Sequence, residues 1–408
     1  MRHGNILRTL IFTSFLLGPL LFPLHPNDWP NWRGPHHNGI SDERINGSWP
    51  TEGPKVLWKA SVGTGFSGFA VADGRAYTMG NSNEIDTVFC FDAAAGQKLW
   101  SFSYPCRLDA LYNEGGPGAT PTIDGARVFT FSKRGDLFCV EAKTGNVVWK
   151  RNLVAELGIT KPRWGFASSP LVQNNLLVLN AGGAGIALDK NDGKTIWLSD
   201  TNAAGYATPV PVTIDSENCV AIFGAKQLAL VRVSDGKKLW GFPWVTQYDI
   251  NAPEPVLAGK DKLFISSYDH GCALLQLSAA EPKVIWQNRN MANHFNGCVC
   301  LDGCIYGIHG NSDDPKRELR CLDVTSGEVK WQFQGFGLGS LCAARDTLIV
   351  LGDHGELAVA PATPKDFRPE ARAQVLGGKC WTVPALANGR IYCRNAQGTV
   401  VCLQVNAE

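Results

Sequence analysis

The sequence lacks an excess of charge of either sign and any run of basic residues. Its 38 lysines and arginines nearly balance its 37 aspartates and glutamates, so the formal net charge is +1. Proteins that bind nucleic acid usually concentrate positive charge in a patch or stripe that attracts phosphate. The even charge therefore excludes nucleic acid as the expected partner.

The familiar motifs of several enzyme classes are also absent. No Gly-x-Ser-x-Gly, no phosphate-binding Walker loop and no His-Glu-x-x-His occurs in the 408 residues. These motifs position a nucleophile, a phosphate cradle or a zinc ion, so the hydrolases, nucleotide-hydrolysing enzymes and zinc peptidases that they define are not expected. The chain also has no adjacent pair of cysteines and no Cys-x-x-Cys-His haem motif.

Long apolar runs are absent except at the N-terminus. Residues 10–24 are apolar and follow three residues that carry or can carry positive charge, Arg2, His3 and Arg8. The run is short for a membrane span, which needs roughly 20 residues, and it has the layout of a signal peptide. We expect residues 1–25 to be a signal peptide, or alternatively an uncleaved N-terminal anchor. The protein is then exported, periplasmic or associated with the cell envelope, and it contacts a membrane only through this segment.

What the sequence does contain is a repeat that ends in tryptophan. In its clearest copy, Asp323 stands eight residues and Gly327 four residues before Trp331. Successive copies are 42 to 49 residues apart, and their tryptophans are Trp58, Trp100, Trp149, Trp197, Trp240, Trp286 and Trp331. Four copies, ending at Trp100, Trp149, Trp197 and Trp331, keep the acidic residue and the glycine between two short strands. The copy ending at Trp240 has Arg232 in the acidic position, and the copies ending at Trp58 and Trp286 have weaker turns. A period of this length with β-type patterning predicts a β-propeller.

Each repeat also begins with a hairpin. Apolar residues alternate around turn-forming pairs such as Asp73-Gly74 and Asn388-Gly389, so that one repeat supplies four strands. The strand Val56–Trp58 has no turn before it, whereas Val400–Leu403 has no tryptophan strand after it. Pairing these two strands closes the ring, and an eighth repeat that has lost its tryptophan falls near residues 373–375.

The predicted fold is therefore all-β: an eight-bladed β-propeller of four-stranded antiparallel blades, closed by pairing of the N- and C-terminal strands. Residues 26–54 are expected to form an irregular lead-in and residues 55–408 the propeller. Because each blade packs only on its neighbours, a ring of this size does not need to divide into smaller domains. We expect a monomer.

Thirteen cysteines in an exported protein raise the question of disulfides. Four of them occupy the same place in their repeats, namely Cys90, Cys139, Cys321 and Cys402. Equivalent sites on neighbouring blades lie about 10 Å apart, which is a sheet spacing, whereas a disulfide needs Cα atoms within about 7 Å. Most of the cysteines are therefore expected to be free and buried.

Cys298, Cys300 and Cys304 have a spacing that suggests a metal cluster. A two-residue Asp-Gly turn, however, places Leu301 opposite Cys304 in the hairpin, so Cys300 is not opposite Cys304. A structural zinc site would also need a fourth ligand nearby. No metal site is predicted.

The order of acidic residue, Thr/Ser-Gly and tryptophan resembles the PQQ-type propeller repeat. That repeat occurs in quinoprotein dehydrogenases and in the propeller lipoprotein of the outer-membrane β-barrel assembly machinery. Four further segments look like landmarks of exported PQQ-like propeller proteins common in planctomycete-type bacteria: Asn31–Pro35, Pro162–Phe166, Asn293–Phe295 and Cys380–Thr382. The resemblance covers nearly the whole chain and implies the propeller fold, but little chemistry.

The loops that lead into the inner strands are the irregular part of the chain. In a propeller they lie on one face together with the turns between the second and third strands; we call this the entering-loop face. Binding groups usually lie on loops of a rigid scaffold. The candidate binding residues are Tyr112, Glu114, Arg163, Trp164, Tyr206, Tyr248, Asp249, Asn251, His294, Asn296 and Trp381. We expect an exported, non-catalytic scaffold that binds a protein partner or small ligand on this face; the alternative is that these residues only cap the ring.

The resemblance to quinoprotein dehydrogenases implies a second hypothesis, a PQQ/Ca²⁺-dependent oxidoreductase acting on alcohols or sugars. Such an enzyme needs oxygen ligands for Ca²⁺, an aspartate base and an aromatic floor under the quinone. Glu114, Asp249 and Asn251 would supply the oxygens, and Trp164 or Trp381 the floor. The missing cysteine pair and haem motif count against this hypothesis, so no catalytic residue is assigned. Clustering of the three oxygen donors around one cavity would favour the enzyme.

Overall fold

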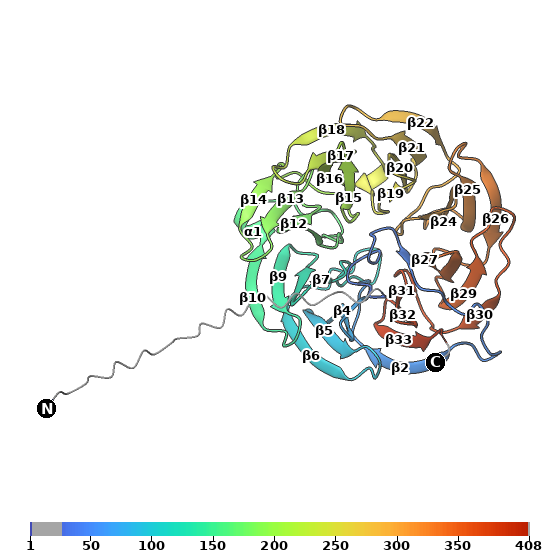
Figure 1. The fold of residues 1–408 in the computed structure, drawn as a ribbon, viewed down its shortest axis with the longest axis horizontal. Coiled ribbons are helices and arrows are strands. Elements are labelled where there is room, and N and C mark those ends of the chain that lie inside the picture. The colour runs from blue at the N-terminus through green and yellow to red at the C-terminus, as the bar shows by residue number, and fades with distance from the viewer. Residues whose placement is uncertain (2–26, 407–408) are drawn as a thin grey trace.

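The computed structural model is a ring of eight β-sheets around a central axis (Figure 1). It describes Met1 and residues 27–406, so the segment expected to be a signal peptide or anchor lies, apart from Met1, outside the described residues. Each sheet contains four antiparallel strands, and one sheet carries a fifth strand. The predicted eight-bladed all-β fold is confirmed. Among the residues described, no helix is long and apolar enough to cross a membrane.

The blades follow one another along the chain, and each runs from its innermost to its outermost strand. The first blade contains β3 (Ala70–Ala72), β4 (Arg75–Ser82), β5 (Ile85–Asp92) and β6 (Lys98–Pro105), and the second contains β7 (Thr122–Asp124), β8 (Arg127–Phe131), β9 (Asp136–Glu141) and β10 (Val147–Asn152). The third blade contains β11 (Leu171–Gln173), β12 (Leu176–Leu179), β13 (Ile186–Asp189) and β14 (Thr195–Leu198), and the fourth contains β15 (Val210–Ile214), β16 (Glu217–Phe223), β17 (Gln227–Arg232) and β18 (Lys238–Pro243).

The remaining four blades complete the ring, and the last of them takes its outermost strand from the N-terminal region. The fifth blade contains β19 (Val256–Leu257), β20 (Lys262–Ser267), β21 (Gly271–Gln276) and β22 (Lys283–Asn288), and the sixth contains β23 (Val299–Leu301), β24 (Cys304–His309), β25 (Glu318–Asp323) and β26 (Val329–Gln334). The seventh blade contains β27 (Ser340–Ala344), β28 (Thr347–Leu351), β29 (Glu356–Pro361) and β30 (Ala371–Gln374), with β1 (Ile40–Ser41) beside β27. The eighth blade contains β31 (Ala385–Ala387), β32 (Arg390–Arg394), β33 (Thr399–Gln404) and β2 (Lys55–Ser61). Two short helices, α1 (Leu153–Leu157) and η1 (Gln247–Asp249), lie in loops.

In four blades the acidic residue and glycine of the repeat form the turn before the tryptophan strand. In the sixth blade, the carboxylate of Asp323 accepts hydrogen bonds from the backbone N–H groups of Thr325 (2.8 Å) and Ser326 (3.0 Å). This is an Asx turn, in which a side chain satisfies backbone donors that the ladder leaves free. Gly327 then takes φ +71°, in the left-handed region that glycine adopts without strain.

The tryptophans join each blade to the next. Each one donates its indole Nε1–H to a backbone carbonyl of the following blade at 2.8–3.1 Å. The pairs are Trp58 with Ala93, Trp100 with Ala142, Trp149 with Lys190, Trp197 with Val233, Trp240 with Ser278, Trp286 with Val324 and Trp331 with Thr363. Because a buried indole N–H needs an acceptor, this bond fixes how one blade sits on its neighbour.

The glycine completes the same contact from the other side. A Cβ atom built on Gly236 in the fourth blade would lie 2.5 Å from a ring carbon of Trp197 in the third blade. The same close approach recurs at Gly96, Gly145, Gly193 and Gly327, each against the preceding tryptophan. The fixed spacing in the sequence therefore encodes a contact between blades: a glycine turn seated on the ring of its neighbour's tryptophan.

Ring closure follows the predicted pairing. Val56 pairs with Leu403 and Trp58 with Cys402, so that β2 becomes the outermost strand of the eighth blade. Three strands of this blade come from the C-terminus and one from the N-terminal region. Trp58 then contacts the first blade through Ala93, which leaves no blade without neighbours on both sides.

One joint of the ring has no tryptophan, and residues 41–54 cover it. Strand β30 of the seventh blade carries Ala373 in the region where the repeat predicts the lost tryptophan. Trp49 packs against the hydrophobic core shared by the seventh and eighth blades. The carboxylate of Glu43 accepts a hydrogen bond of 2.6 Å from the backbone N–H of Gly389 in the eighth blade. We call residues 41–54 the strap, because this segment takes the place of the missing contact.

Residues 28–41 cross the axis of the ring, where dark blue chain lies at the centre of Figure 1. They contact five blades: Trp29 forms a bridge with Val71, the Pro30 carbonyl accepts from the N–H of Ile123, Trp32 donates to Glu254, Arg33 donates to the Cys298 carbonyl, and Ile40 pairs with Ala343. Burial raises the pKa of Glu254, and the nearby charge of Arg33 opposes that rise. The chain's own lead-in thus fills the channel that a propeller leaves along its axis.

All thirteen cysteines are free, and twelve are buried. The thirteenth, Cys300, is half-buried, and burial raises its pKa to about 11. Leu301 pairs with Cys304 across the Asp-Gly turn, as predicted. The described residues contain no group of three or more His, Cys, Asp or Glu placed to hold a metal ion.

The seating of glycine on tryptophan can be tested by a matched pair of substitutions. Gly236→Ala introduces a left-handed alanine, costing about 1–2 kcal/mol, and also a clash with Trp197. Gly303→Ala introduces the same kind of strain at φ +76° but meets no atom within 4 Å. We expect Gly236→Ala to lower the free energy of unfolding by a further 1–3 kcal/mol, roughly the cost of overpacking. Equal denaturant midpoints for the two variants would contradict the proposed contact.

Candidate functional site

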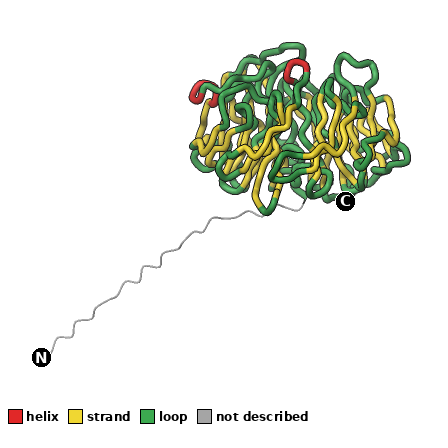
Figure 2. The backbone as a smooth tube through the Cα atoms, turned by 90° about the horizontal axis from the view of Figure 1, so that it is seen from above, coloured by secondary structure: helices red, strands yellow, loops and turns green. Residues whose placement is uncertain are grey.

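The long loops of the ring lie on one face. The chain enters every blade at its innermost strand, so the loops into the inner strands and the turns between second and third strands lie on the same side. Both short helices, α1 and η1, lie on this entering-loop face, at the upper edge of the view in Figure 2. The opposite face carries two-residue hairpin turns such as Asp73-Gly74. All eleven candidate binding residues belong to the loops of the entering-loop face.

The guanidinium of Arg163 lies among three aromatic rings. Its central carbon is 5.1 Å from the ring centre of Trp164, 5.3 Å from that of Tyr248 and 5.8 Å from that of Tyr112. The three rings come from three different entering loops. Arg163 is exposed, and no oxygen of the described residues accepts a hydrogen bond from its side chain. We call these four residues the arginine cage; it holds a cation in place and leaves its N–H donors available.

Two residues beneath the cage hold its loops together. Tyr206 packs on Trp164 at 5.9 Å between ring centres, and burial raises the pKa of its hydroxyl to about 12. The backbone N–H of Tyr206 donates to the carbonyl of Asn251 at 2.9 Å. The Asn251 amide donates at 3.0–3.1 Å to three carbonyls, those of Gly224, Ala225 and Trp244. Asn251 is fully buried, so it acts as a staple between loops.

The cage contains strained backbone. Tyr112 has φ +64°, Tyr248 φ +61° and its neighbour Asp249 φ +57°. Left-handed backbone costs a residue with a side chain roughly 1–2 kcal/mol, and such residues persist where the surroundings hold them and a function uses them. A hydrogen bond of 3.1 Å from the backbone N–H of Asp249 to the Thr246 carbonyl holds this turn. In this left-handed backbone conformation, the rings of Tyr112 and Tyr248 both lie beside the guanidinium of Arg163.

A second group of rings forms a column across the same face. Trp381 stacks on Phe295 with ring centres 4.2 Å apart and on Phe66 at 5.7 Å. His294 continues the column against Phe295, and Tyr268 contacts His294 at 4.9 Å. We call these five residues the ring column. The Trp381 ring already has two ring neighbours, so it packs as part of the column more than as a free platform.

Charged and amide groups tie the ring column to its neighbours. The Lys379 ammonium lies 4.2 Å from the ring centre of Trp381 and 2.9 Å from the carboxylate of Glu114. The amide of Asn296 donates to the carbonyl of Trp381 at 2.8 Å. Glu114 and Lys379 lie on the loops into the second and eighth blades, so their ion pair spans the entry to the first blade. Glu114 thereby belongs with the ring column, although Tyr112 on the same loop belongs to the arginine cage.

Two of the three proposed calcium donors are engaged within the protein. The side-chain oxygen of Asn251 accepts a hydrogen bond of 2.7 Å from the hydroxyl of Ser267, and its amide is fully engaged inside the loop. Glu114 is paired with Lys379. A hard cation needs several free oxygens converging on one point, so these residues do not fit a calcium-bound quinone.

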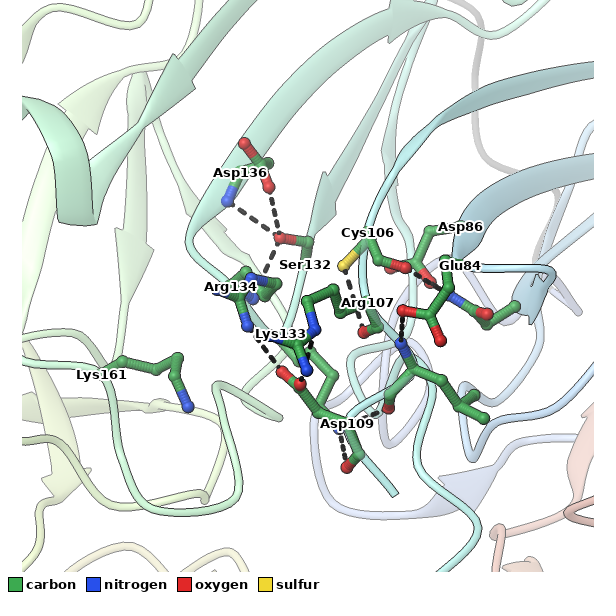
Figure 3. A network of polar contacts seen from close by, with 12 residues as sticks. Glu84, Asp86, Cys106, Arg107, Asp109, Ser132, Lys133, Arg134, Asp136 and Lys161 are labelled. Carbon is green, nitrogen blue, oxygen red and sulfur yellow. Dashed lines mark hydrogen bonds and ion pairs between the residues drawn. The ribbon is translucent and has the colours of Figure 1, made fainter. Parts of the chain in front are cut away.

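A groove opens beside the arginine cage, above the second blade. Its volume is about 520 Å³. Its wall is formed by Glu84, Arg107, Leu108, Asp109, Ala110, Leu111, Arg134, Lys161, Arg163 and Trp164. Figure 3 shows the polar network along one side of it, with Arg134 directed at Asp109 and Lys161 lying apart on the neighbouring loop. This volume falls within the range of about 300–1,000 Å³ that is usual for ligand sites.

Several residues of the face were not among the candidates. Phe66 lies in the loop into the first blade, which the aromatic loops into the other blades would have indicated by analogy. Tyr268 lies in a turn between second and third strands, which faces the same side. Phe295 directly follows the candidate His294, and Lys379 lies two residues before the candidate Trp381. These side chains belong to the site because loops of different blades meet there, and the sequence alone does not show which loops meet.

The ring and its repeat define the class of protein as a PQQ-like β-propeller. A family model described as outer membrane protein assembly factor BamB matches residues 84–333. The chain belongs to this family. The resemblance to PQQ-type propellers that the repeat suggested is thereby confirmed.

Comparisons with individual proteins agree with this assignment. A BamB from Burkholderia pseudomallei (strain K96243) is 23% identical over 293 residues, which cover 60% of this chain and 72% of that protein. The crystal structure of BamB from Moraxella catarrhalis superposes with a TM-score of 0.64 and 14% identity, covering 86% of this chain and 99% of that chain. Quinohemoprotein alcohol dehydrogenase from Comamonas testosteroni superposes with a TM-score of 0.72 and 14% identity, covering 94% and 81%. At these identities the superpositions establish the fold alone.

The buried histidine of the ring column makes stability depend on pH. Burial lowers the pKa of His294 to about 4, and its Nδ1 accepts a hydrogen bond from the backbone N–H of Ser312. The unfolded chain, with a histidine pKa near 6.5, binds more protons, so this contribution is complete above pH 6.5 and is lost as the pH falls toward 4. Burial also lowers the pKa of His37 and His309 to about 4, and these add to the same fall.

We expect His294→Gln to reduce the loss of stability between pH 7.5 and pH 4.5 by on the order of 2 kcal/mol relative to the unsubstituted protein. Denaturant unfolding at the two pH values measures this difference. The exposed His354 supplies the control, and His354→Gln should leave the pH dependence as it was. An unchanged pH dependence in His294→Gln would show that the histidine titrates alike in the folded and unfolded chain.

Proposed function

We propose that the protein is an exported, non-catalytic propeller scaffold that binds a protein partner on its entering-loop face, in the bacterial cell envelope. The observation that carries this proposal is the arginine cage. A guanidinium held by three rings, with its donors unengaged, is ready for a carboxylate or carbonyl of a second molecule. Arginine, tyrosine and tryptophan are also the residues that dominate binding energy at protein interfaces.

The exposure of the cage favours a macromolecule over a small ligand. Tyr112 is 79% exposed and Tyr248 is 53% exposed. Beside them, Leu111 and Val245 are also exposed large apolar residues. A small-molecule site would enclose most of its ligand, whereas these side chains project from the surface. A partner that covers them would bury apolar area around a central arginine.

Membership of the BamB family supports the same proposal. The family description and the curated relatives name outer membrane protein assembly factors. Such a role is performed in the envelope with other proteins, and the apolar N-terminal sequence agrees with export. We therefore propose a periplasmic or envelope-associated location and a protein as the ligand.

Site-directed photo-crosslinking tests which face binds. A photoreactive phenylalanine analogue placed at Leu111 or Val245 should form a crosslinked product in cells of the source organism. The same analogue at Thr144 or Ser234, exposed turn positions of the opposite face, should form none. Crosslinking from the opposite face alone would overturn the site assignment.

The role of the arginine cage is tested by substituting Arg163 in the protein that carries the photoreactive residue. Arg163→Ala should remove most of the product, because it removes the cation around which the rings are arranged. Arg163→Lys should restore the product only in part, since an ammonium lacks the planar fork that stacks on rings and pairs with carboxylates. Arg289→Ala, an exposed arginine of the loop into the sixth blade, is the control and should leave the product intact. Equal products from Arg163→Ala and Arg289→Ala would contradict the proposal.

The enzymatic alternative is tested directly. With added PQQ and Ca²⁺, we expect no reduction of an artificial acceptor dye that depends on an alcohol or a sugar, because Asn251 and Glu114 are engaged within the protein. Asp249→Ala serves as the comparison. A dye signal that requires PQQ and disappears in Asp249→Ala would overturn the non-catalytic proposal.

A further inference from the structure

The groove above the second blade has an unequal charge. Four cationic residues contribute to its wall, namely Arg107, Arg134, Lys161 and Arg163, against two carboxylates, Glu84 and Asp109. The lining therefore carries a net charge of 4 − 2 = +2, although the whole chain carries only +1. The positive charge is local, so it contributes to what binds here more than to the behaviour of the protein as a whole.

The two carboxylates are already engaged by the chain. Glu84 accepts a hydrogen bond of 3.1 Å from the backbone N–H of Leu108. Asp109 forms an ion pair of 2.7 Å with Arg134. Below them, the ammonium of Lys133 donates to the backbone carbonyls of Leu108 (3.0 Å) and Asp109 (3.1 Å). The network in Figure 3 thus holds the loop in shape and pairs Asp109 with Arg134, whereas Glu84 keeps its charge.

The remaining cations have weak partners or none. The side chain of Arg107 is 75% exposed, and its nearest carboxylate oxygen, on Asp109, is 3.8 Å away. Lys161 donates only to the adjacent Pro162 carbonyl at 3.4 Å. These two cations stand on different entering loops, those of the second and third blades. An anionic ligand between them would replace weak internal contacts by charge-assisted hydrogen bonds.

We propose that this groove receives an extended acidic segment of a protein partner, with carboxylates on Arg107 and Lys161 and aliphatic side chains on the apolar wall. Ala110, Leu111 and Trp164 form the apolar part of the same wall. A polyphosphate or a lipid headgroup would leave that part uncovered, whereas a peptide carries both kinds of group. The proposal rests on partner binding at the entering-loop face and names the chemistry of the partner there.

Fluorescence anisotropy with the full-length protein tests the proposal. The probe is a labelled twelve-residue peptide in which glutamates are interspersed with leucine and serine, and its comparison is the same peptide with glutamine in place of glutamate. We expect binding of the acidic peptide that weakens as salt is raised, and at least about tenfold weaker binding of the glutamine peptide. The double variant Arg107→Glu/Lys161→Glu should weaken binding of the acidic peptide by about tenfold or more.

The matched control is Lys226→Glu/Arg289→Glu, which changes two exposed cations of the same face by the same total charge. It should retain the affinity of the unsubstituted protein; equal losses in the two double variants would mean that only net charge matters and would overturn the groove. Displacement of the bound acidic peptide by tripolyphosphate at lower concentrations than unlabelled peptide requires would also overturn it. So would co-sedimentation with phosphatidylglycerol vesicles that is lost in Arg107→Glu/Lys161→Glu.

The outcomes separate this proposal from the proposed function. If crosslinking depends on Arg163 but peptide binding does not depend on Arg107 and Lys161, the proposed function is supported and the proposed peptide site in the groove is wrong. Peptide binding that depends on the groove, without any crosslinked product from the entering-loop face, would remove the function and leave an acidic-peptide site. Circular dichroism melts of both double variants, expected to match the unsubstituted protein, exclude unfolding as the cause of lost binding.

Discussion

The contact on which the structure depends is the seating of one blade's glycine turn on the tryptophan of the blade before it. The indole gives each joint one hydrogen bond and a flat apolar surface, and the glycine allows the backbone to approach that surface. Seven joints have the indole hydrogen bond, five of them also have the glycine turn, and the strap covers the eighth. The contact lies near the outer strands, away from the residues that form the surface of the entering-loop face. The sequences of these loops are therefore free to differ from blade to blade.

That division explains how the entering-loop face can carry strain. Tyr112 and Tyr248 adopt left-handed backbone that an isolated loop would avoid. The ring beneath them is rigid, and Asn251 joins their surroundings through buried hydrogen bonds. The free energy lost in two turns is small beside that of eight packed sheets. What results is a surface in which an arginine is held ready before any partner arrives, which lowers the entropy lost on binding.

The sequence predicts the ring well because the contacts that define it repeat. Asp323, Gly327 and Trp331 are close in the chain, and the same spacing of acidic residue, glycine and tryptophan occurs in four of the blades. The face was predicted less completely, because its contacts join residues with no regular spacing. Asn251 was a plausible calcium ligand by residue type, yet its amide turns inward to carbonyls of a neighbouring loop. The hydrogen bond from Trp32 to Glu254 joins residues 222 positions apart, and the sequence around either residue does not indicate this contact.

The path of residues 28–41 through the axis has a consequence for the order of folding. These residues are synthesised before every blade, yet their partners include Cys298 and Ala343, and β2 pairs with β33 near the other end of the chain. Successive blades can pair within themselves as they emerge, because their strands are neighbours in sequence. The first part of the ring must wait for the last. The ring can therefore close only after the eighth blade has been made, whereas the contact of Trp29 with Val71 can form as soon as the first blade exists.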